Sequence, residues 1–321
     1  MSRALVLVTG LDGAADEPSL QTLTLARRLA GTVDAVAIGP DAAAVAAGLG
    51  AHGAATVHVA DGPALAAFAP DAWARILADL AGSLDAGFIL APGTETGNDV
   101  LARVAARLGE PLAANCTSAT AGDPIAVTRV RWGGSLLEEA LLRPSRRAVL
   151  TVAPHAIQAE PASAAGTIAR LSPTLDPADL VVVVKDRVAA AGGGVSLADA
   201  KVVVTGGRGV GSPEGFAPVE ELAGLLGGAV GCSRAVTIAG WRPHTDQVGQ
   251  TGTKIAPQIY IAAGVSGATQ HMAGAKGAKK ILAVNKDPEA PIMTNADYAV
   301  VGDLFEVLPA VSAEIRRARG G

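Results

Sequence analysis

Short apolar runs alternate with longer segments whose apolar residues recur every three or four positions through the first third of the chain. The short runs are typical of strands in a parallel sheet, and the periodic segments are typical of helices that cover it. The clearest helix follows Gly97, with Thr96 or Asn98 as its expected cap. Its apolar face comprises Val100, Leu101, Val104, Ala105 and Leu108. The expected strands are Ala4–Thr9, Ala35–Ile38, Thr56–Val59 and Ala86–Ala91.

This alternation stops at about Ala126, where arginine-containing extended segments begin. The segments RVRWGG and RRAVLTVAPHAI predict antiparallel strands that complete the first domain. The valine run Val181–Val184 predicts its closing strand. Small residues and turn formers then predominate, so we expect a linker near residues 190–199, centred on Gly192–Asp199. The expected domains are therefore an N-terminal α/β domain, residues 1–195, and a C-terminal domain, residues 196–321.

Five further apolar strands are expected in the C-terminal domain: KVVVT, AVG, IYIAA, KILAV and YAVV. Each is followed at once by glycine, hydroxyl, amide or charged residues. These residues are Gly206–Gly209, Cys232–Arg234, Gly264–Gly267, Asn285 and Gly302–Asp303. Ligands of open α/β sheets bind outside the carboxyl ends of the strands, where glycine lets the backbone approach closely. The strand ends therefore predict a binding edge for a large anionic ligand.

Common nucleotide motifs are absent from this half of the sequence. GGRGVGS departs from the dinucleotide fingerprint because Ser212 stands where a third glycine or alanine belongs, and GQTGTK lacks the phosphate-loop spacing. Glycines after strands are also ordinary turn formers. The combination of Arg208, Arg234 and a Ser266–Gly267 turn before a helix over Ala268–Ala273 favours a pyrophosphate nevertheless. His271 is either a ligand contact or an ordinary structural histidine.

Composition and charge narrow the function classes. The chain has 321 residues, half of them apolar, and a formal net charge of −4 without any basic run, which disfavours nucleic acid as a partner. No apolar stretch is long enough for a membrane span or a signal sequence, so we expect a cytoplasmic protein without membrane insertion. Cys116 and Cys232 are expected to be small buried hydrophobes. We find no candidate catalytic residues and no candidate metal ligands.

A family resemblance emerges from the second half. SGATQHMAG, ILAVNKDPEAPI and ADYAVVGDLF, preceded by GGRGVGS, GCSR and QVGQTG, closely resemble the FAD domain of the electron-transfer flavoprotein alpha subunit, over about Lys201 to Pro309. The first half resembles the family's N-terminal domain in general pattern and in its Gly-x-Asp helix start near Gly97. The resemblance implies an N-terminal Rossmann-like parallel-sheet domain and a C-terminal doubly wound FAD-binding domain.

Site residues follow from the same resemblance. It implies one FAD in the C-terminal domain, with Arg208 and Ser233 near the phosphates and Arg234 beside the flavin, where its charge would raise the reduction potential. Thr251 would hydrogen-bond toward N5, and His271 would approach the pyrimidine end of the flavin. The loop along the isoalloxazine would comprise Gln247, Val248, Gly249, Gln250 and Thr251. The pyrophosphate would be wrapped by Ser266, Gly267, Ala268, Thr269, Gln270 and His271. The adenosine part would be held by Asn285, Asp303 and Leu304.

Partners are also implied by the resemblance. They are a beta subunit that carries AMP or a second flavin, acyl-CoA or other flavin dehydrogenases as donors, and a quinone oxidoreductase as acceptor. Gly231–Cys232 resembles the branch linked to nitrogen fixation and carnitine metabolism, whereas QVGQTG resembles the respiratory branch, so the donor and any electron bifurcation stay open. The alternative is an FAD- or nucleotide-binding oxidoreductase or regulatory subunit not linked to acyl-CoA dehydrogenases.

Overall fold

The computed structural model describes the chain except residues 1, 12, 133–135, 186–195, 199 and 320–321. Two compact units make up the chain, residues 1–187 and 188–321, and each is described by itself. Of the expected linker near residues 190–199, the structure describes only 196–198.

Unit 1 is built on a nine-stranded sheet with the order β11-β5-β4-β1-β6-β10-β7-β8-β9. All neighbours from β11 to β7 are parallel, and the β7–β8 and β8–β9 pairs are antiparallel. The strands are β1 Arg3–Val8, β4 Thr32–Ile38, β5 Thr56–Ala60, β6 Phe88–Pro92, β7 Leu112–Thr120, β8 Ile125–Arg131, β9 Leu136–Leu142, β10 Ala148–Val152 and β11 Thr167–Arg170; a small hairpin joins β2 Gly10–Leu11 to β3 Ala14–Ala15.

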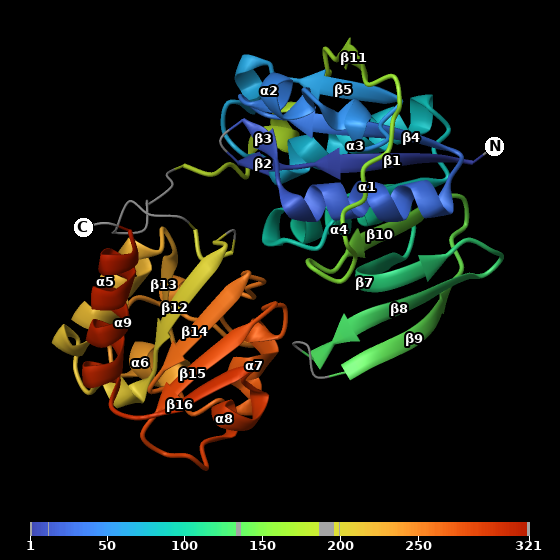
Figure 1. Ribbon diagram of the computed structural model, residues 1–321. Helices are drawn as coiled ribbons and strands as arrows, with labels where there is room; N and C mark the ends of the chain where they lie inside the picture. The colour runs from blue at the N-terminus through green and yellow to red at the C-terminus, as the bar shows by residue number, and fades with distance from the viewer. Residues whose placement is uncertain (1, 12, 133–135, 186–195, 199, 320–321) are drawn as a thin grey trace. The chain divides into compact units, whose positions relative to one another are not determined.

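Helices cover both faces of this sheet (Figure 1). The helices α1 Glu17–Leu29 and α2 Ala42–Ala46 bury Leu23 and Val45 against one face. The helices α3 Pro70–Ser83 and α4 Glu95–Leu108 bury their apolar sides against the other. The four earliest expected strands are confirmed with small shifts of their ends, and the sheet is parallel where the alternation of strand and helix predicted it.

The α4 helix is confirmed, but the predicted cap was wrong. Thr94 is the N-cap, and its Oγ1 accepts a hydrogen bond from the backbone N–H of Gly97 at 3.2 Å. Asn98 lies inside the helix instead, where its Nδ2 donates to Gly93 O at 3.0 Å and its Oδ1 accepts from Thr151 at 2.7 Å. Thr96 also lies inside the first turn. The chain therefore enters the helix two residues earlier than the pattern suggested.

Two expectations for the end of unit 1 were wrong. β10, within RRAVLTVAPHAI, pairs in parallel with both β6 and β7, and all five of its residues are buried. A strand covered on both faces belongs in the parallel centre of a sheet, which explains its continuous apolar sequence. Val181–Val184 forms no strand: Val181 is 77% exposed, and the N–H of Val184 donates to Phe68 O at 2.9 Å.

The antiparallel edge of the sheet behaves as RVRWGG predicted, since β8 pairs antiparallel with β9 in an unbroken register. β9 is the last strand of the order and carries large apolar side chains on its surface. Leu136, Leu137 and Leu141 are 52%, 69% and 62% exposed.

Unit 2 is a five-stranded, wholly parallel sheet in the order β13-β12-β14-β15-β16, which is the doubly wound architecture expected from the sequence. Its strands are β12 Val202–Gly206, β13 Ala229–Cys232, β14 Ile259–Ala263, β15 Ile281–Asn285 and β16 Tyr298–Val301. One face packs against α5 Ala217–Leu225, α6 Arg234–Ile238 and α9 Leu304–Ala318; the other packs against α7 Thr269–Ala275 and α8 Pro291–Asn295. Each expected strand of this unit is confirmed.

Both cysteines are fully buried, as expected, and burial raises the pKa of each thiol to about 12. The thiolate is the reactive form, so a native protein at pH 8 should react with a disulfide reagent at a small fraction of the rate of a free thiol. Absorbance of released thionitrobenzoate, with and without denaturant, measures this. Rapid reaction of Cys116 or Cys232 without unfolding would contradict it.

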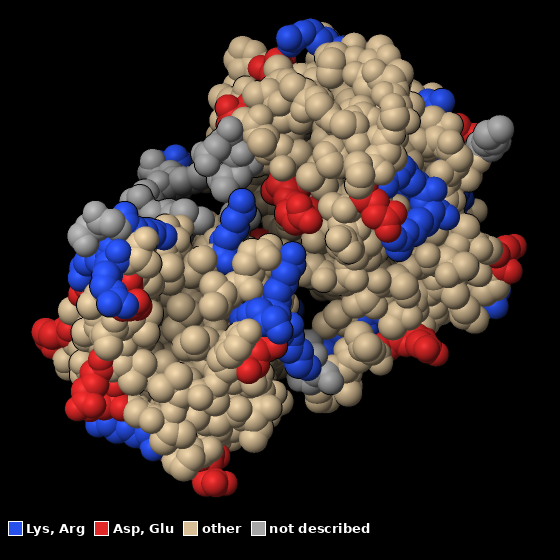
Figure 2. All heavy atoms as spheres, in the orientation of Figure 1, with Lys and Arg blue, Asp and Glu red and all other residues tan. Residues whose placement is uncertain are grey.

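Among the described residues, no helix combines the length and apolar character needed to cross a bilayer. On the face drawn in Figure 2, Lys and Arg side chains lie among Asp and Glu side chains on each unit, with wide uncharged surface between them.

Candidate functional site

The carboxyl edge of unit 2 has a topological switch point between β12 and β14. From β12 the chain crosses to β13 on one side, whereas from β14 it continues to β15 on the other. The loops after β12 and β14 therefore diverge at this point and leave a crevice of the kind where α/β sheets bind ligands.

Glycines bring these two loops into backbone contact. The N–H of Gly207 donates to Ala263 O at 2.9 Å, and that of Gly209 donates to Gly264 O at 3.1 Å. A Cβ on Gly207 would lie 2.1 Å from Gly264 O, so only glycine fits there. Arg208, between these glycines, is thereby held at the edge of the sheet.

The loop over Gln247–Thr251 is hydrogen-bonded both to the end of β13 and to the first turn of α7. The N–H of Val248 donates to Cys232 O at 2.9 Å, and the N–H of Gln250 donates to Gln270 O at 2.7 Å. Its side chains are also tied, because Gln247 Nε2 donates to Thr251 Oγ1 at 2.9 Å. The hydroxyl hydrogen of Thr251 has no acceptor among the described residues, so it can be donated to a ligand.

The turn at Ser266–Gly267 is fixed by α8. Gly267 has φ +79°, and a Cβ on it would lie 2.4 Å from the backbone nitrogen of Ile292. The N–H of Ile292 donates to Ser266 O at 3.0 Å. Helix α7 follows directly, with Ala268 as its N-cap and Thr269 and Gln270 in its exposed first turn. The turn and the loop over 247–251 thus meet at the start of α7.

His271, like Gln247, is a buried polar residue of this region. Its Nε2 lies 2.6 Å from the hydroxyl oxygen of Tyr260, which is itself fully buried on β14. Nδ1 of His271 is buried and has no hydrogen-bond partner among the described residues. Burial lowers the pKa of His271 to about 4, so the imidazole is neutral near pH 7. If the Tyr260 hydroxyl donates to Nε2, the ring proton lies on Nδ1, available to an acceptor.

The lowered pKa of His271 makes the stability of unit 2 depend on pH. As pH falls from about 6.5 to about 4, the unfolded chain gains a proton that the folded chain does not, so folding weakens over that window. Denaturant unfolding of the FAD-free chain should show this loss, of a few kcal/mol at most. His271→Gln should flatten that part of the profile, whereas His244→Gln, at an exposed position, should not. Superimposable profiles for all three proteins would contradict the assignment.

Two arginines at the carboxyl edge of unit 2 have no described ion-pair partner. Arg208 and Arg234 are both exposed, and neither forms an ion pair with another described residue. Ser233, the N-cap of α6, has a buried Oγ that lacks a hydrogen-bond partner among the described residues. Unpaired guanidinium groups beside unsatisfied polar atoms are arranged to meet an anion.

The three residues expected near the adenosine have structural partners already. Asn285 Nδ2 donates to Val265 O at 2.9 Å, and its Oδ1 accepts from the N–H of Asp287 at 3.0 Å. Asp303 caps α9 by accepting from the N–H of Phe305 at 3.0 Å and pairs with Lys286 at 2.8 Å. Leu304 is buried in the core of the unit. All three stabilise the edge, and contact with a ligand stays a prediction.

Tyr260 was missed by the sequence reasoning. The available signal was a tyrosine within the otherwise aliphatic strand IYIAA, since a buried tyrosine hydroxyl needs a hydrogen-bond partner. Among the described residues, no group of three or more His, Cys, Asp or Glu side chains is placed to hold a metal ion.

The fold and this edge define a doubly wound α/β protein of the kind that binds nucleotides at its strand ends. Residues 4–176 match the electron transfer flavoprotein domain, and residues 196–276 match the electron transfer flavoprotein FAD-binding domain. The second match contains the loops after β12, β13 and β14 together with α7.

Similar proteins extend over the whole chain. The electron transfer flavoprotein subunit alpha of Megasphaera elsdenii is 38% identical over 327 residues, covering 98% of this chain and 96% of the relative. The subunit alpha of Mycobacterium tuberculosis is 40% identical over 322 residues and covers both chains completely. Protein FixB of Clostridium saccharobutylicum is 40% identical over 273 residues, covering 84% of this chain and 81% of the relative. The chain belongs to the electron transfer flavoprotein alpha subunit family.

Proposed function

We propose that the chain is the FAD-carrying subunit of a heterodimeric, cytoplasmic electron carrier, with one FAD at the carboxyl edge of unit 2. A beta subunit would complete the heterodimer and carry AMP or a second flavin. Electrons would arrive from acyl-CoA dehydrogenases or other flavin dehydrogenases and leave toward a quinone oxidoreductase. The observation that carries the proposal is a pair of buried polar atoms without described hydrogen-bond partners, Ser233 Oγ and His271 Nδ1, in segments after β13 and β14 that fall within the matched FAD-binding domain.

The residues at this edge fit the chemistry of FAD. Two buried atoms, His271 Nδ1 and Ser233 Oγ, need hydrogen-bond partners, which the carbonyl and phosphate oxygens of the cofactor can provide. The glycine contact between the loops after β12 and β14, as at Gly207, holds Arg208 at the strand ends, where its guanidinium can meet a pyrophosphate. When bound, FAD supplies reversible electron transfer, and the protein has to hold it and set its potential.

Each side chain then has a simple physical task. Arg208 and Ser233 would hold phosphate oxygens, and Arg234 would place a positive charge where electrons are added. The neutral His271, oriented by Tyr260, would donate from Nδ1 toward an oxygen at the pyrimidine end. Thr251 would donate its hydroxyl hydrogen toward N5, because Gln247 already occupies a lone pair of its oxygen. Asn285, Asp303 and Leu304 would flank the adenosine.

The test begins with the chain co-expressed with its beta subunit. We expect a yellow protein that releases one FAD per alpha chain on denaturation and that is bleached by an acyl-CoA dehydrogenase and its substrate under anaerobic conditions. Bleaching should be lost when the dehydrogenase is omitted. A folded, colourless heterodimer that does not take up FAD would overturn the proposal, whereas FAD binding without reduction by any acyl-CoA dehydrogenase would overturn the donor assignment alone.

A further inference from the structure

Unit 1 has a cavity at the carboxyl end of its own sheet. Its volume is about 610 Å³, and it is lined by residues that follow β1, β4, β5 and β6. The chain runs from β1 toward β4 on one side and from β6 toward β10 and β7 on the other, so the cavity lies at the switch point of this sheet. That is the position where doubly wound sheets bind small molecules.

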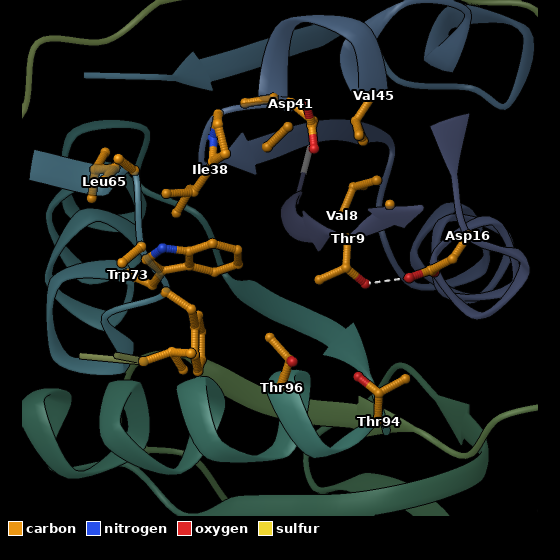
Figure 3. A pocket seen from close by; sticks show the side chains of 18 of the residues that line it. Val8, Thr9, Asp16, Ile38, Asp41, Val45, Leu65, Trp73, Thr94 and Thr96 are labelled. Atoms are coloured by element: carbon orange, nitrogen blue, oxygen red, sulfur yellow. Dashed lines mark hydrogen bonds between the residues drawn. The ribbon is translucent and has the colours of Figure 1, made fainter. Parts of the chain in front are cut away.

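One end of the cavity is apolar and aromatic. Trp73, Leu65 and Ile38 lie together on one side in Figure 3. Phe68 packs edge-on against Trp73, with ring centroids 5.0 Å apart and an interplanar angle of 86°. Apolar and aromatic walls of this kind suit a flat ring system.

The other end is polar and is formed by residues that follow β1, β4 and β6. Thr9 donates its hydroxyl to Asp16 Oδ2 at 2.5 Å, a contact drawn in Figure 3. Thr96, inside the first turn of α4, has a hydroxyl without a partner among the described residues. Asp41 lies above the same space in Figure 3, and its carboxylate likewise has no described partner. The free groups are therefore a carboxylate and a hydroxyl, which are partners for ligand hydroxyls and amines.

The charges at the polar end disfavour a phosphate. Asp16 and Asp41 contribute two negative charges to the lining, against the single positive charge of Lys185. The starts of α1 and α4 beside the cavity are capped by the protein's own side chains, because Asp16 Oδ1 accepts from the N–H of Ser19 at 2.8 Å and Thr94 Oγ1 accepts from the N–H of Gly97 at 3.2 Å. An anion at this end would meet a net negative charge.

We propose that the cavity of unit 1 binds a neutral nucleoside. The base packs against Trp73 between Leu65 and Ile38, and the sugar hydroxyls donate to the carboxylate of Asp41 and exchange a hydrogen bond with Thr96. Its lining residues belong to unit 1, whereas the FAD edge belongs to unit 2, so the chain would take a second small molecule. Nucleotides bind more weakly because their phosphates approach Asp16 and Asp41.

Isothermal titration of the FAD-loaded heterodimer with adenosine, and separately with AMP, tests the proposal. FAD loading keeps the cofactor edge filled during the titration. We expect saturable binding of adenosine and weaker binding of AMP to unit 1. Asp41→Asn should weaken adenosine binding about tenfold, as expected for the loss of one charged hydrogen bond. It should also reduce the ratio of adenosine affinity to AMP affinity. Thr96→Val should weaken adenosine binding without reducing that ratio.

The control is Glu139→Gln on β9, which removes one exposed negative charge away from the cavity lining. It should leave adenosine binding unchanged. A beta subunit can hold a nucleotide itself. Adenosine binding is therefore assigned to the cavity of unit 1 only if Asp41→Asn and Thr96→Val weaken it. No saturable adenosine binding at millimolar concentration, or binding that both variants retain in full, would overturn the proposal. Either result leaves the FAD assignment untouched, since FAD content is measured independently in every sample.

Discussion

Gly207→Ala is expected to weaken FAD binding at least tenfold, enough to lose the cofactor during gel filtration. The added Cβ would lie 2.1 Å from Gly264 O and 2.5 Å from Val265 Cα, both backbone atoms that cannot move independently. The loops after β12 and β14 must separate, at a cost of about 1 to 3 kcal/mol. Because Arg208 follows directly, its guanidinium would leave the edge as well. Fluorescence titration of the FAD-free protein with FAD measures the loss.

Gly224→Ala on α5 is the matched control for that experiment. A Cβ at Gly224 meets no atom within 4 Å, and alanine favours a helix over glycine. This variant should bind FAD as the parent does and be slightly more stable. Unchanged FAD affinity in Gly207→Ala would show that the contact between the two loops does not shape the cofactor site.

Arg234→Ala is expected to lower the first reduction potential of bound FAD by tens of millivolts. A positive charge beside the ring stabilises an added electron, and an interaction of about 1.4 kcal/mol corresponds to about 59 mV for a one-electron step. The guanidinium is exposed and has no ion-pair partner among the described residues, so its field is screened by water and is not cancelled by a carboxylate. Spectroelectrochemical titration of the heterodimer gives the potential.

In the same titration, Arg234→Lys distinguishes the effect of the positive charge from the effect of the guanidinium shape. Lysine keeps the positive charge, so most of the potential should be retained, whereas Arg234→Ala should show the full decrease at the same FAD content. Equal potentials in Arg234→Ala and the parent would remove Arg234 from this role, even if FAD affinity fell.

Much of the fold was predictable because its strands are short apolar runs with distinct ends. Ile259–Ala263 is a clear example: it is apolar apart from the hydroxyl of Tyr260, lies between Pro257 and Gly264, and is central in its sheet. β10 was predicted to pair antiparallel, whereas it pairs in parallel. An apolar sequence indicates that a strand is buried, but it does not indicate which strands lie beside it. Only the closure of the sheet between β6 and β7 fixes its parallel pairing. Val181–Val184 has strand propensity but pairs with no strand of the sheet.

The candidate site likewise has residues that chain order predicts and residues that only three-dimensional contacts reveal. Residues that follow strands, such as Ser233 and Ser266, could be predicted as site residues because chain order places them at one edge of the sheet. Tyr260 was missed because its importance depends on a contact with His271 across the sheet-to-helix layer. The cavity of unit 1 was missed for a similar reason, since Trp73, Asp41 and Thr96 come from three segments without a shared motif.

The exposed leucines of β9 affect how the protein can be produced. An outermost strand with apolar side chains and unpaired backbone groups is a template for edge-to-edge self-association. Recombinant chain made without its companion should form soluble aggregates at high concentration, and Leu137→Lys should improve the monomer yield.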